Sequence, residues 1–467
     1  MLSLLIKKEL KEIIGSSKFV YSFAVSALLI LITFYVGAKN YQINKSQYDA
    51  AVAENIRSMS GVTDWRMINH KIFLPPLPLA SLVSGISNDV GRNIGMQGRG
   101  ELIAKDSKYN EEPIFAVFRF LDLNFLFQII LSLFAILFCY NAINGEKERG
   151  TLRLVFSNAI PRDTFILGKV LGSTIALILP LLVPMLVGFL LLLVLGVPMS
   201  FEDWMKLFLI IVTGFLLFSV FINLSVFVSI ITKNSSTSFL LLLVTWIFFV
   251  LVIPKTSVLI AGRAVNVPLI DELNTKKNQF SMQLNREHFN SLSGFRPANK
   301  DNFMQEFQQF MEKNNQARDE KTKSFNEKLN RERINRQEVQ QAVALNLARI
   351  SPSASFSLAA SSFAGTSLNL VSNYREQADN YQKQFAKFQQ EKTGMTTGGG
   401  GMMFVIRTDG DKKPPEINPA ELPKFEFKPA TFSAALGSGL IDIGLLVVFN
   451  IIFFAAAYLR FLKFDLR

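Results

Sequence analysis

Long uncharged apolar runs alternate with polar segments along this chain of 467 residues. A helix needs about 20 consecutive apolar residues to cross the hydrocarbon core of a bilayer. Six runs reach that length and predict transmembrane helices at 18–38, 120–143, 167–196, 204–231, 237–261 and 434–459. We therefore predict an all-α polytopic membrane protein whose surroundings are a lipid bilayer.

Two polar segments between the spans are long, 39–118 and 263–432. Prolines in the first, Pro75, Pro76 and Pro78, predict irregular structure. The second is rich in Gln, Glu, Lys, Asn and Phe, and its phenylalanines recur at helical spacing. It predicts a mainly helical domain with helices at 269–291, 301–347 and 355–391 and possible short strands at 402–407 and 424–429.

The first 17 residues have an amphipathic pattern. One helical face carries Leu2, Leu5, Ile6, Leu10 and Ile13, and lysines flank it. This pattern is typical of an interfacial helix that lies on the inner leaflet, the alternative being an ordinary cytosolic lead-in. A cleavable signal peptide fits less well, because its apolar region would be shorter.

Basic residues collect in short segments at one side of the predicted topology. The stretches 1–18, 144–169, Lys233 and 460–467 together hold 13 basic and 6 acidic residues, out of a net charge of +12. Such short basic stretches mark the cytoplasmic side of a membrane protein. We expect a bacterial cytoplasmic membrane protein with 39–118 and 263–432 facing outward, a cytoplasmic tail at 460–467 and no role in nucleic-acid binding.

Candidate catalytic and metal-binding residues are sparse. The single cysteine, Cys139, lies in an apolar run, and the two histidines, His70 and His288, are far apart in sequence. This argues against a disulfide and against a Cys/His metal cluster. Gly168-Lys169 lacks the first glycine and the Ser/Thr of a P-loop, so we expect no ATP site and no resident cofactor in this chain.

The segment between spans two and three, 144–165, carries the strongest functional signal. Glu146 and Arg149 can pair at i, i+3. Gly150 allows either close backbone approach or an exit from helical geometry. An apolar face follows at helical spacing, and Pro161 ends the helix at Ile160; the face consists of Leu152, Val155, Phe156 and Ala159. A short amphipathic helix under the membrane suits docking into a groove on a soluble partner.

The motif GEKERGTL (145–152), followed by Pro161-Arg162 and Gly168-Lys169, resembles the coupling region of type-2 ABC transporter permeases. Residues 75–86, 349–356 and the end of span five also resemble that family, nearest to the permease of the nitrous-oxide-reductase maturation system. The resemblance implies an outer domain between spans five and six, a second permease subunit that is the same or homologous, and an ATPase, normally in two copies, that binds ATP and Mg²⁺. It also implies which residues meet the ATPase, namely Glu146, Glu148, Arg149, Gly150, Thr151, Leu152 and Arg153, with Pro161 and Arg162 shaping the return to span three. The alternative is a merely solvated loop beside the membrane.

Polar and helix-breaking residues inside the spans are candidates for a gate or pathway, because polar groups at membrane depth are costly. They are Asn223, Trp246, Pro254 and Asp442. The alternative for the asparagine is a hydrogen bond between helices, and for the tryptophan an interfacial anchor.

These features favour an exporter or extractor driven by a separate ATPase. A relay or scaffold subunit that transmits ATP hydrolysis to the outer domain without moving cargo, with an extracytoplasmic partner protein, is the main alternative. A membrane enzyme is disfavoured, because the spans carry no paired histidines, no Ser–Lys dyad and no HExxH motif.

Overall fold

The computed structural model describes residues 1–65, 67–96, 102, 104–105, 122–157, 160–296, 303–393 and 416–463. Within these ranges, six helical segments are long and apolar enough to cross a membrane, which confirms the predicted all-α polytopic class. They run from Ser17 to Arg57, Leu123 to Glu148, Arg162 to Val194, Phe201 to Ile231, Ser235 to Ala264 and Phe432 to Leu462.

The second and fifth spans are composite helices. Span two consists of α3 (Leu123–Phe125), the π-helix η4 (Leu126–Leu131), α4 (Ser132–Cys139) and α5 (Asn144–Glu148). Span five consists of α9 (Ser235–Ile247), the π-helix η5 (Phe248–Val252) and α10 (Ile253–Ala264). The other four are α2 (Ser17–Arg57), α7 (Arg162–Val194), α8 (Phe201–Ile231) and α15 (Phe432–Leu462).

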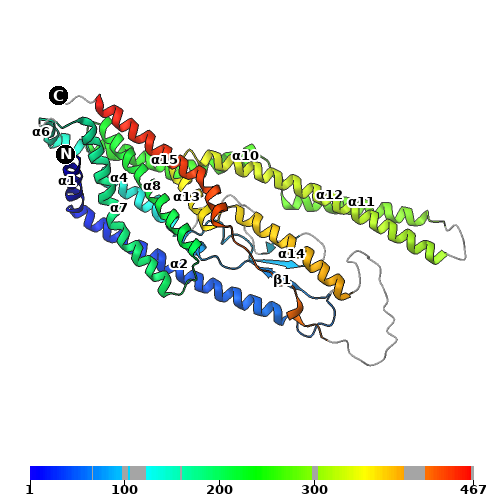
Figure 1. Cartoon of the computed structure of the whole chain (residues 1–467). Helices are drawn as coiled ribbons and strands as arrows, with labels where there is room; N and C mark the ends of the chain where they lie inside the picture. The colour runs from blue at the N-terminus through cyan, green and yellow to red at the C-terminus, as the bar shows by residue number, and fades with distance from the viewer. Residues whose placement is uncertain are drawn as a thin grey trace.

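The helix α8 lies at the centre of the bundle. Two thirds (67%) of its most apolar window is buried, against 50% or less for every other span. The other spans leave many Leu, Val and Ile side chains exposed, as a lipid environment requires. The N-terminus and the last residues of α15 lie at one end of the bundle with α1 (Leu2–Ile14) and α6 (Thr151–Ser157), here called the terminal end (Figure 1). The opposite end is called the far end.

Span one continues far beyond the predicted residue 38. The helix α2 has 41 residues, about 60 Å at 1.5 Å per residue, roughly twice the thickness of the hydrocarbon core. The expectation of irregular structure from residue 39 is therefore wrong as far as Arg57. Residues 39–57 contain neither Gly nor Pro, which explains why the helix is not interrupted there.

A small antiparallel sheet forms at the far end from the segment after α2. It contains β1 (His70–Phe73), β2 (Asn93–Met96) and β3 (Ala104–Lys105), with His70 opposite Met96. Side chains of α14 (Asn369–Thr393) pack against it and form a second hydrophobic core with Ile72 and Ile94; they include Tyr374, Tyr381 and Phe385.

The strand predicted at 424–429 does not form, and 402–407 lies outside the described residues. Instead, the backbone at Lys428 is hydrogen-bonded to the side chain of Gln377 on α14. The backbone N–H of Lys428 donates to Gln377 Oε1, and Gln377 Nε2 donates to the Lys428 carbonyl, both at 2.8 Å. The amide of Gln377 on α14 thus takes the place of a neighbouring strand.

Two long helices form a hairpin that projects away from the bundle at the far end, α11 (Ile270–Ser293) and α12 (Phe303–Ala348) (Figure 1). The rings of Phe280 and Phe325 stack between them with centroids 4.0 Å apart. At the tip, Phe295 packs on Phe310 at 4.7 Å. The phenylalanines of this segment therefore hold the hairpin together.

The helix expected at 355–391 is instead two helices. The first, α13 (Pro352–Ala364), ends at Gly365, whose φ of +69° breaks the helix before α14. It is buried along almost its whole length and packs against α8 and α15. A glycine of α15 allows this close packing: a Cβ placed on Gly439 would lie 2.7 Å from the ring of Phe363 on α13. The far-end domain therefore inserts a helix among the spans.

Candidate functional site

The predicted coupling segment forms two short helices at the terminal end, α5 and α6, separated by Arg149 and Gly150. Gly150 has a φ of +71°, and nothing lies within 4 Å of where its Cβ would be. Glycine is therefore needed for the left-handed conformation and not for close approach of another backbone. The described part of α6 reaches Ser157, residues 158–159 lie outside the described residues, and Pro161 is the N-cap residue of α7.

The apolar face of α6 points into the protein. Leu152 is 4% exposed, and Val155 and Phe156 pack beside Phe165 of α7 and Phe461 of α15. This differs from the expectation that the face docks on a partner, because the chain's own spans three and six cover it; Ala159 lies outside the described residues. A different apolar residue, Leu154, is 67% exposed at this end.

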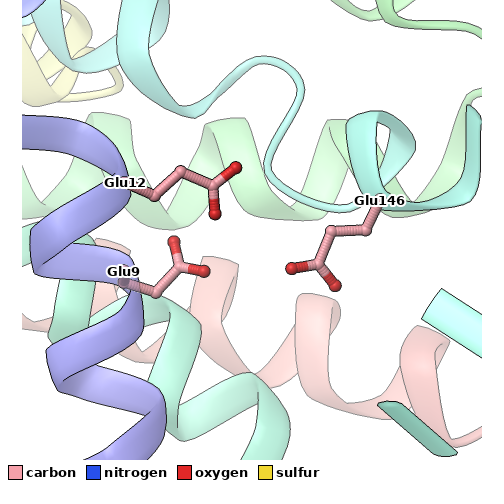
Figure 2. Close-up of side chains that lie close together, drawn as sticks. All are labelled: Glu9, Glu12 and Glu146. Carbon is pink, nitrogen blue, oxygen red and sulfur yellow. The ribbon is translucent and has the colours of Figure 1, made fainter. Parts of the chain in front are cut away.

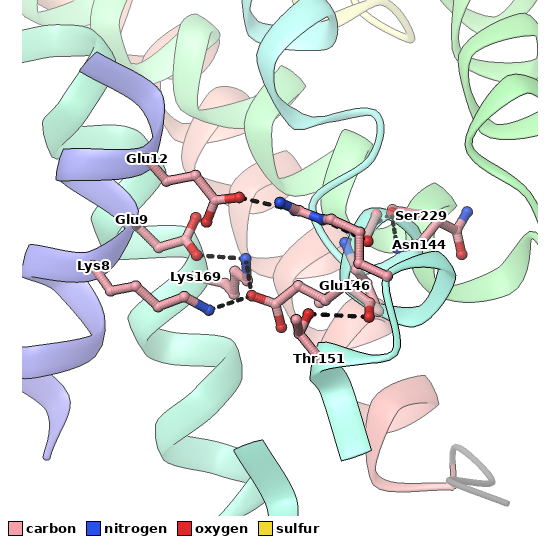
Figure 3. Close-up of polar contacts among 11 residues, drawn as sticks. Lys8, Glu9, Glu12, Asn144, Glu146, Thr151, Lys169 and Ser229 are labelled. Carbon is pink, nitrogen blue, oxygen red and sulfur yellow. Dashed lines mark hydrogen bonds and ion pairs between the residues drawn. The ribbon is translucent and has the colours of Figure 1, made fainter. Parts of the chain in front are cut away.

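Glu146 is buried and joins three helices. Its Oε1 lies 2.9 Å from Nζ of Lys169 on α7 and 2.6 Å from Nζ of Lys8 on α1 (Figure 3). Lys169 also pairs with Glu9 of α1, so two cations balance two carboxylates. Buried charges persist when they are paired in this way. Burial still raises the pKa of the Glu9 carboxyl, while the Lys169 ammonium opposes that rise.

Arg149 makes a second connection to α1. Its Nη2 lies 2.8 Å from Oε1 of Glu12, and its Nε donates to the Gly145 carbonyl at 2.9 Å. The ion pair raises the pKa of Arg149. The predicted pair between Glu146 and Arg149 is therefore wrong: each of them pairs with α1 instead.

Figure 2 shows the carboxylates of Glu9, Glu12 and Glu146 close to one another, an arrangement that could hold a metal ion. Each already has a cationic partner, however: Lys169 for Glu9, Arg149 for Glu12, and both Lys8 and Lys169 for Glu146. The arrangement is an ion-pair network, and we assign no metal to it.

Glu148 connects the segment to span five. Its Oε1 accepts the backbone N–H of Ser235 at 2.7 Å, and its Oε2 accepts the Ser235 hydroxyl at 2.8 Å. Ser235 is the first residue of α9, whose own N-cap residue, Asn234, makes no capping hydrogen bond. Glu148 therefore caps this helix with a negative charge, which also favours the helix dipole.

Further hydrogen bonds attach the segment to spans four and six. The backbone N–H groups of Ile143 and Asn144 donate to Ser229 Oγ on α8 at 3.0 and 3.1 Å. Arg162 Nη1 donates to the Leu462 carbonyl at the end of α15 at 2.5 Å. The hydroxyl of Thr151 donates to the Glu146 carbonyl at 3.2 Å. Among the predicted residues, the side chain of Arg153 is not described.

Of the predicted gate residues, Pro254 and Asp442 line one cavity, whereas Asn223 and Trp246 lie apart from it in contacts between helices. Asn223 Nδ2 on α8 donates to Asn450 Oδ1 on α15 at 2.9 Å. Asn223 therefore makes the hydrogen bond between helices that was the alternative to a gate role. Trp246 is buried, and its Nε1 donates to Ser132 Oγ on α4 at 2.8 Å, so it is no interfacial anchor. Pro254 is buried near the start of α10, directly after the π-helix η5.

Asp442 joins span six to the far-end domain. It is 1% exposed, and Arg349 at the end of α12 reaches both of its oxygens, at 2.7 and 3.2 Å. Hydrogen bonding to Asp442 raises the pKa of Arg349. A cavity of about 170 Å³ lies beside this pair, and Pro254 also contributes to its wall. Sequence reasoning noticed Asp442 as a costly polar residue but gave Arg349 no role.

A family model described as ABC-2 family transporter protein matches residues 4–466. The chain belongs to this family. It is thus the membrane-embedded permease subunit of an ABC transporter, a non-enzymatic multi-pass protein. The match is to the family as a whole and does not single out the nitrous-oxide-reductase maturation subgroup. The comparison with curated proteins gives no match.

Proposed function

We propose that this ABC-2 family chain is the permease of an ATP-driven exporter or extractor whose energy comes from a separate ATPase. In this proposal two copies of the ATPase, with ATP and Mg²⁺, serve two permease subunits in a bacterial cytoplasmic membrane. The terminal end faces the cytoplasm and the far end faces outward, as the basic stretches indicate. We place the chain in the subgroup with a large outer domain that resembles the nitrous-oxide-reductase maturation permease.

One observation carries the proposal: three charged residues of the coupling segment each bind a different part of the bundle. Glu146 binds Lys169 on α7, Glu148 binds the start of α9, and Arg149 binds Glu12 on α1. A displacement of this short segment therefore acts on two spans and on α1 together. That is what a coupling element between a soluble motor and a permease requires.

The ATPase would meet the exposed side of the same segment. Lys147, Gly150 and Pro161 are exposed there, and Leu154 offers an apolar side chain that is 67% exposed. Glu146 and Leu152 are buried and would act by positioning the segment, not by touching the partner. In this proposal the Leu154 side chain would enter an apolar groove of the ATPase.

Co-purification tests the proposal. The tagged chain should bring down an ATPase in near-equal amounts from native membranes, and Leu154→Asp should reduce that amount strongly. Met304→Asp, which changes an equally exposed residue of α12 (66%), should leave it unchanged. Full recovery of the ATPase by the Leu154 variant would refute docking at this segment, and absence of any co-purifying ATPase would refute the two-component proposal.

The buried helix α13 favours the relay alternative as a second candidate. It packs between α8 and α15, and Gln128 of span two donates to the Ser353 carbonyl at 2.8 Å. Movements of the spans would reach the far-end domain directly, and an extracytoplasmic partner could receive them. If ATP hydrolysis changes proteolytic accessibility of the hairpin in proteoliposomes, relay is supported. Unchanged accessibility during turnover would argue against it.

A further inference from the structure

A cavity of about 200 Å³ lies at the far end, between the extension of α2 beyond the bilayer and the segment that joins β1 to β2. Tyr41 on its wall is 24 residues beyond Ser17, about 36 Å along the helix, past the roughly 30 Å of the hydrocarbon core. The cavity is therefore outside the bilayer and away from the coupling segment. Neither the family nor the proposed function assigns it a role.

Arg92 is the charged residue in the wall of this cavity, and no carboxylate is among the lining residues. Its guanidinium is half-buried, with Nη1 donating to Asn44 Oδ1 at 2.9 Å and Nη2 to Asn88 Oδ1 at 3.4 Å. Among the described residues it forms no ion pair, and burial lowers the pKa of Arg92. A guanidinium has five N–H donors, so three have no acceptor among the described residues.

Aromatic and apolar side chains share the rest of the wall with uncharged polar ones, namely Asn44, Gln47, Ser81, Ser87, Asn88 and Asn93. Tyr41 and Tyr48 lie seven residues apart on α2 and share one helical face. Phe73 is the last residue of β1, Pro75 and Pro76 follow it, and all three contribute apolar surface. A single cation beside aromatic and proline surface suits a ligand with one anionic group on an apolar body.

We propose that this cavity binds a carboxylate attached to an apolar group, with Arg92 holding the carboxylate. A planar monoanion matches the fork of a single guanidinium, whereas a phosphate dianion would call for a second cation that the lining lacks. The volume is below the roughly 300 to 1,000 Å³ of a site for a whole drug-sized molecule. The cavity therefore takes an end group, either of a free organic acid or of a peptide C-terminus.

Direct binding to the purified full-length chain in nanodiscs tests the proposal. The probes are 4-phenylbutyrate with its neutral amide, and a pentapeptide ending in phenylalanine as the free acid and as the C-terminal amide. At least one acid should bind, and its amide should bind roughly 10- to 100-fold more weakly, as expected for a lost charged hydrogen bond. The acid that binds identifies the source, a free acid or a peptide end.

Variants connect that binding to the cavity. Arg92→Gln should weaken binding of the acid by a similar factor and leave the affinity for the amide unchanged. Arg92→Lys should bind the acid with an affinity between those of the wild type and Arg92→Gln. Arg57→Gln is the matched control, because Arg57 ends α2, which forms one wall of the cavity, but is exposed and pairs with Glu54. The proposal is overturned if neither acid binds, if acid and amide bind equally, if inorganic phosphate binds more tightly than both acids, or if a folded Arg92→Lys protein binds like the wild type. None of these outcomes depends on the ATPase.

Discussion

Glu148 and Ser235 are 87 positions apart in sequence, yet the Glu148 carboxylate accepts both the backbone N–H and the hydroxyl of Ser235, at 2.7 and 2.8 Å. The residue that the family resemblance assigns to partner contact is thus also the cap of span five. An ATPase that moves this segment would pull directly on the first turn of α9. The contact gives the coupling proposal a specific mechanical path.

The buried ammonium of Lys169 should be essential to the terminal end of the bundle. In Lys169→Met, Glu9 loses its partner and Glu146 keeps only Lys8, so we expect a loss of about 3 to 5 kcal/mol in the free energy of unfolding. Chemical unfolding in detergent measures it. Lys8→Met is the control: the Lys8 side chain is 43% exposed, so its loss should cost about 1 kcal/mol or less. Equal effects of the two substitutions would contradict the network.

The pair between Arg349 and Asp442 should hold the far-end domain on span six. Arg349→Met leaves a carboxylate that is 1% exposed without its partner, and we expect a loss of about 3 to 5 kcal/mol in stability. The double variant Arg349→Met with Asp442→Leu removes both charges and should recover most of that loss. Unfolding of the purified chain followed by circular dichroism measures both. If the double variant is as unstable as Arg349→Met alone, the unpaired carboxylate of Asp442 is not the cause of the lost stability.

Close packing of α13 on span six can be tested with two glycines of one helix. A Cβ on Gly439 would lie 2.7 Å from the buried Phe363 ring, so Gly439→Ala should destabilise the protein by about 1 to 3 kcal/mol. At Gly444, nothing lies within 4 Å of the added Cβ, and Gly444→Ala should be neutral or stabilise by about 0.5 to 1 kcal/mol. Thermal unfolding compares them. The same sign for both variants would mean that α13 does not pack as described.

His70 should make the far-end domain sensitive to acid. Burial lowers the pKa of His70 from 6.5 to about 4, and its ring bonds to the Tyr381 hydroxyl at 2.7 Å. The unfolded chain therefore binds a proton in this interval that the folded chain does not. Stability should fall by about 3 kcal/mol as pH drops from 6.5 towards 4, and stay level above 6.5.

The substitution His70→Gln should remove that part of the pH dependence, whereas His288→Gln, at the other histidine of the chain, should preserve it. Unfolding midpoints measured at intervals from pH 7.5 to 4.5 decide between these outcomes. A pH profile that is unchanged in the His70 variant would assign the sensitivity to other groups.

The sequence predicts the spans well, because a helix in lipid needs a long apolar run that few other structures require. It predicts a helix over most of α13 but does not reveal that α13 is a separate helix buried among the spans, because its Ser, Ala and Phe residues form a short run with no polar face. Burial on all sides removes the periodicity that marks a surface helix. The sequence also does not reveal the extension of α2, because a polar helix outside the bilayer has no long apolar run to mark it.

The site was predictable as a segment but not as a network. Charge, Gly150 and position identified residues 144–165, yet pairs such as Glu146 with Lys169 and Lys8, 138 positions away, exist only in the folded chain. From the sequence alone, Lys169 is only a poor match to a P-loop lysine, and nothing indicates that it pairs with Glu146. The apolar spacing of Leu152, Val155 and Phe156 was real, but spacing alone cannot distinguish a face that binds a partner from one that the chain covers itself.

A double-mutant cycle on Glu148 and Ser235 tests the coupling account most directly. The measured quantity is the ATP hydrolysis rate of the co-purified complex in nanodiscs, for Glu148→Ala, Ser235→Ala and both together. If Glu148 acts by holding α9, Glu148→Ala removes both hydrogen bonds and should lower the rate more than Ser235→Ala, which keeps the backbone N–H bond; the double variant should be no slower than Glu148→Ala. A double variant that is slower than Glu148→Ala by the full factor that Ser235→Ala costs alone would contradict the account, because the two residues would then act independently.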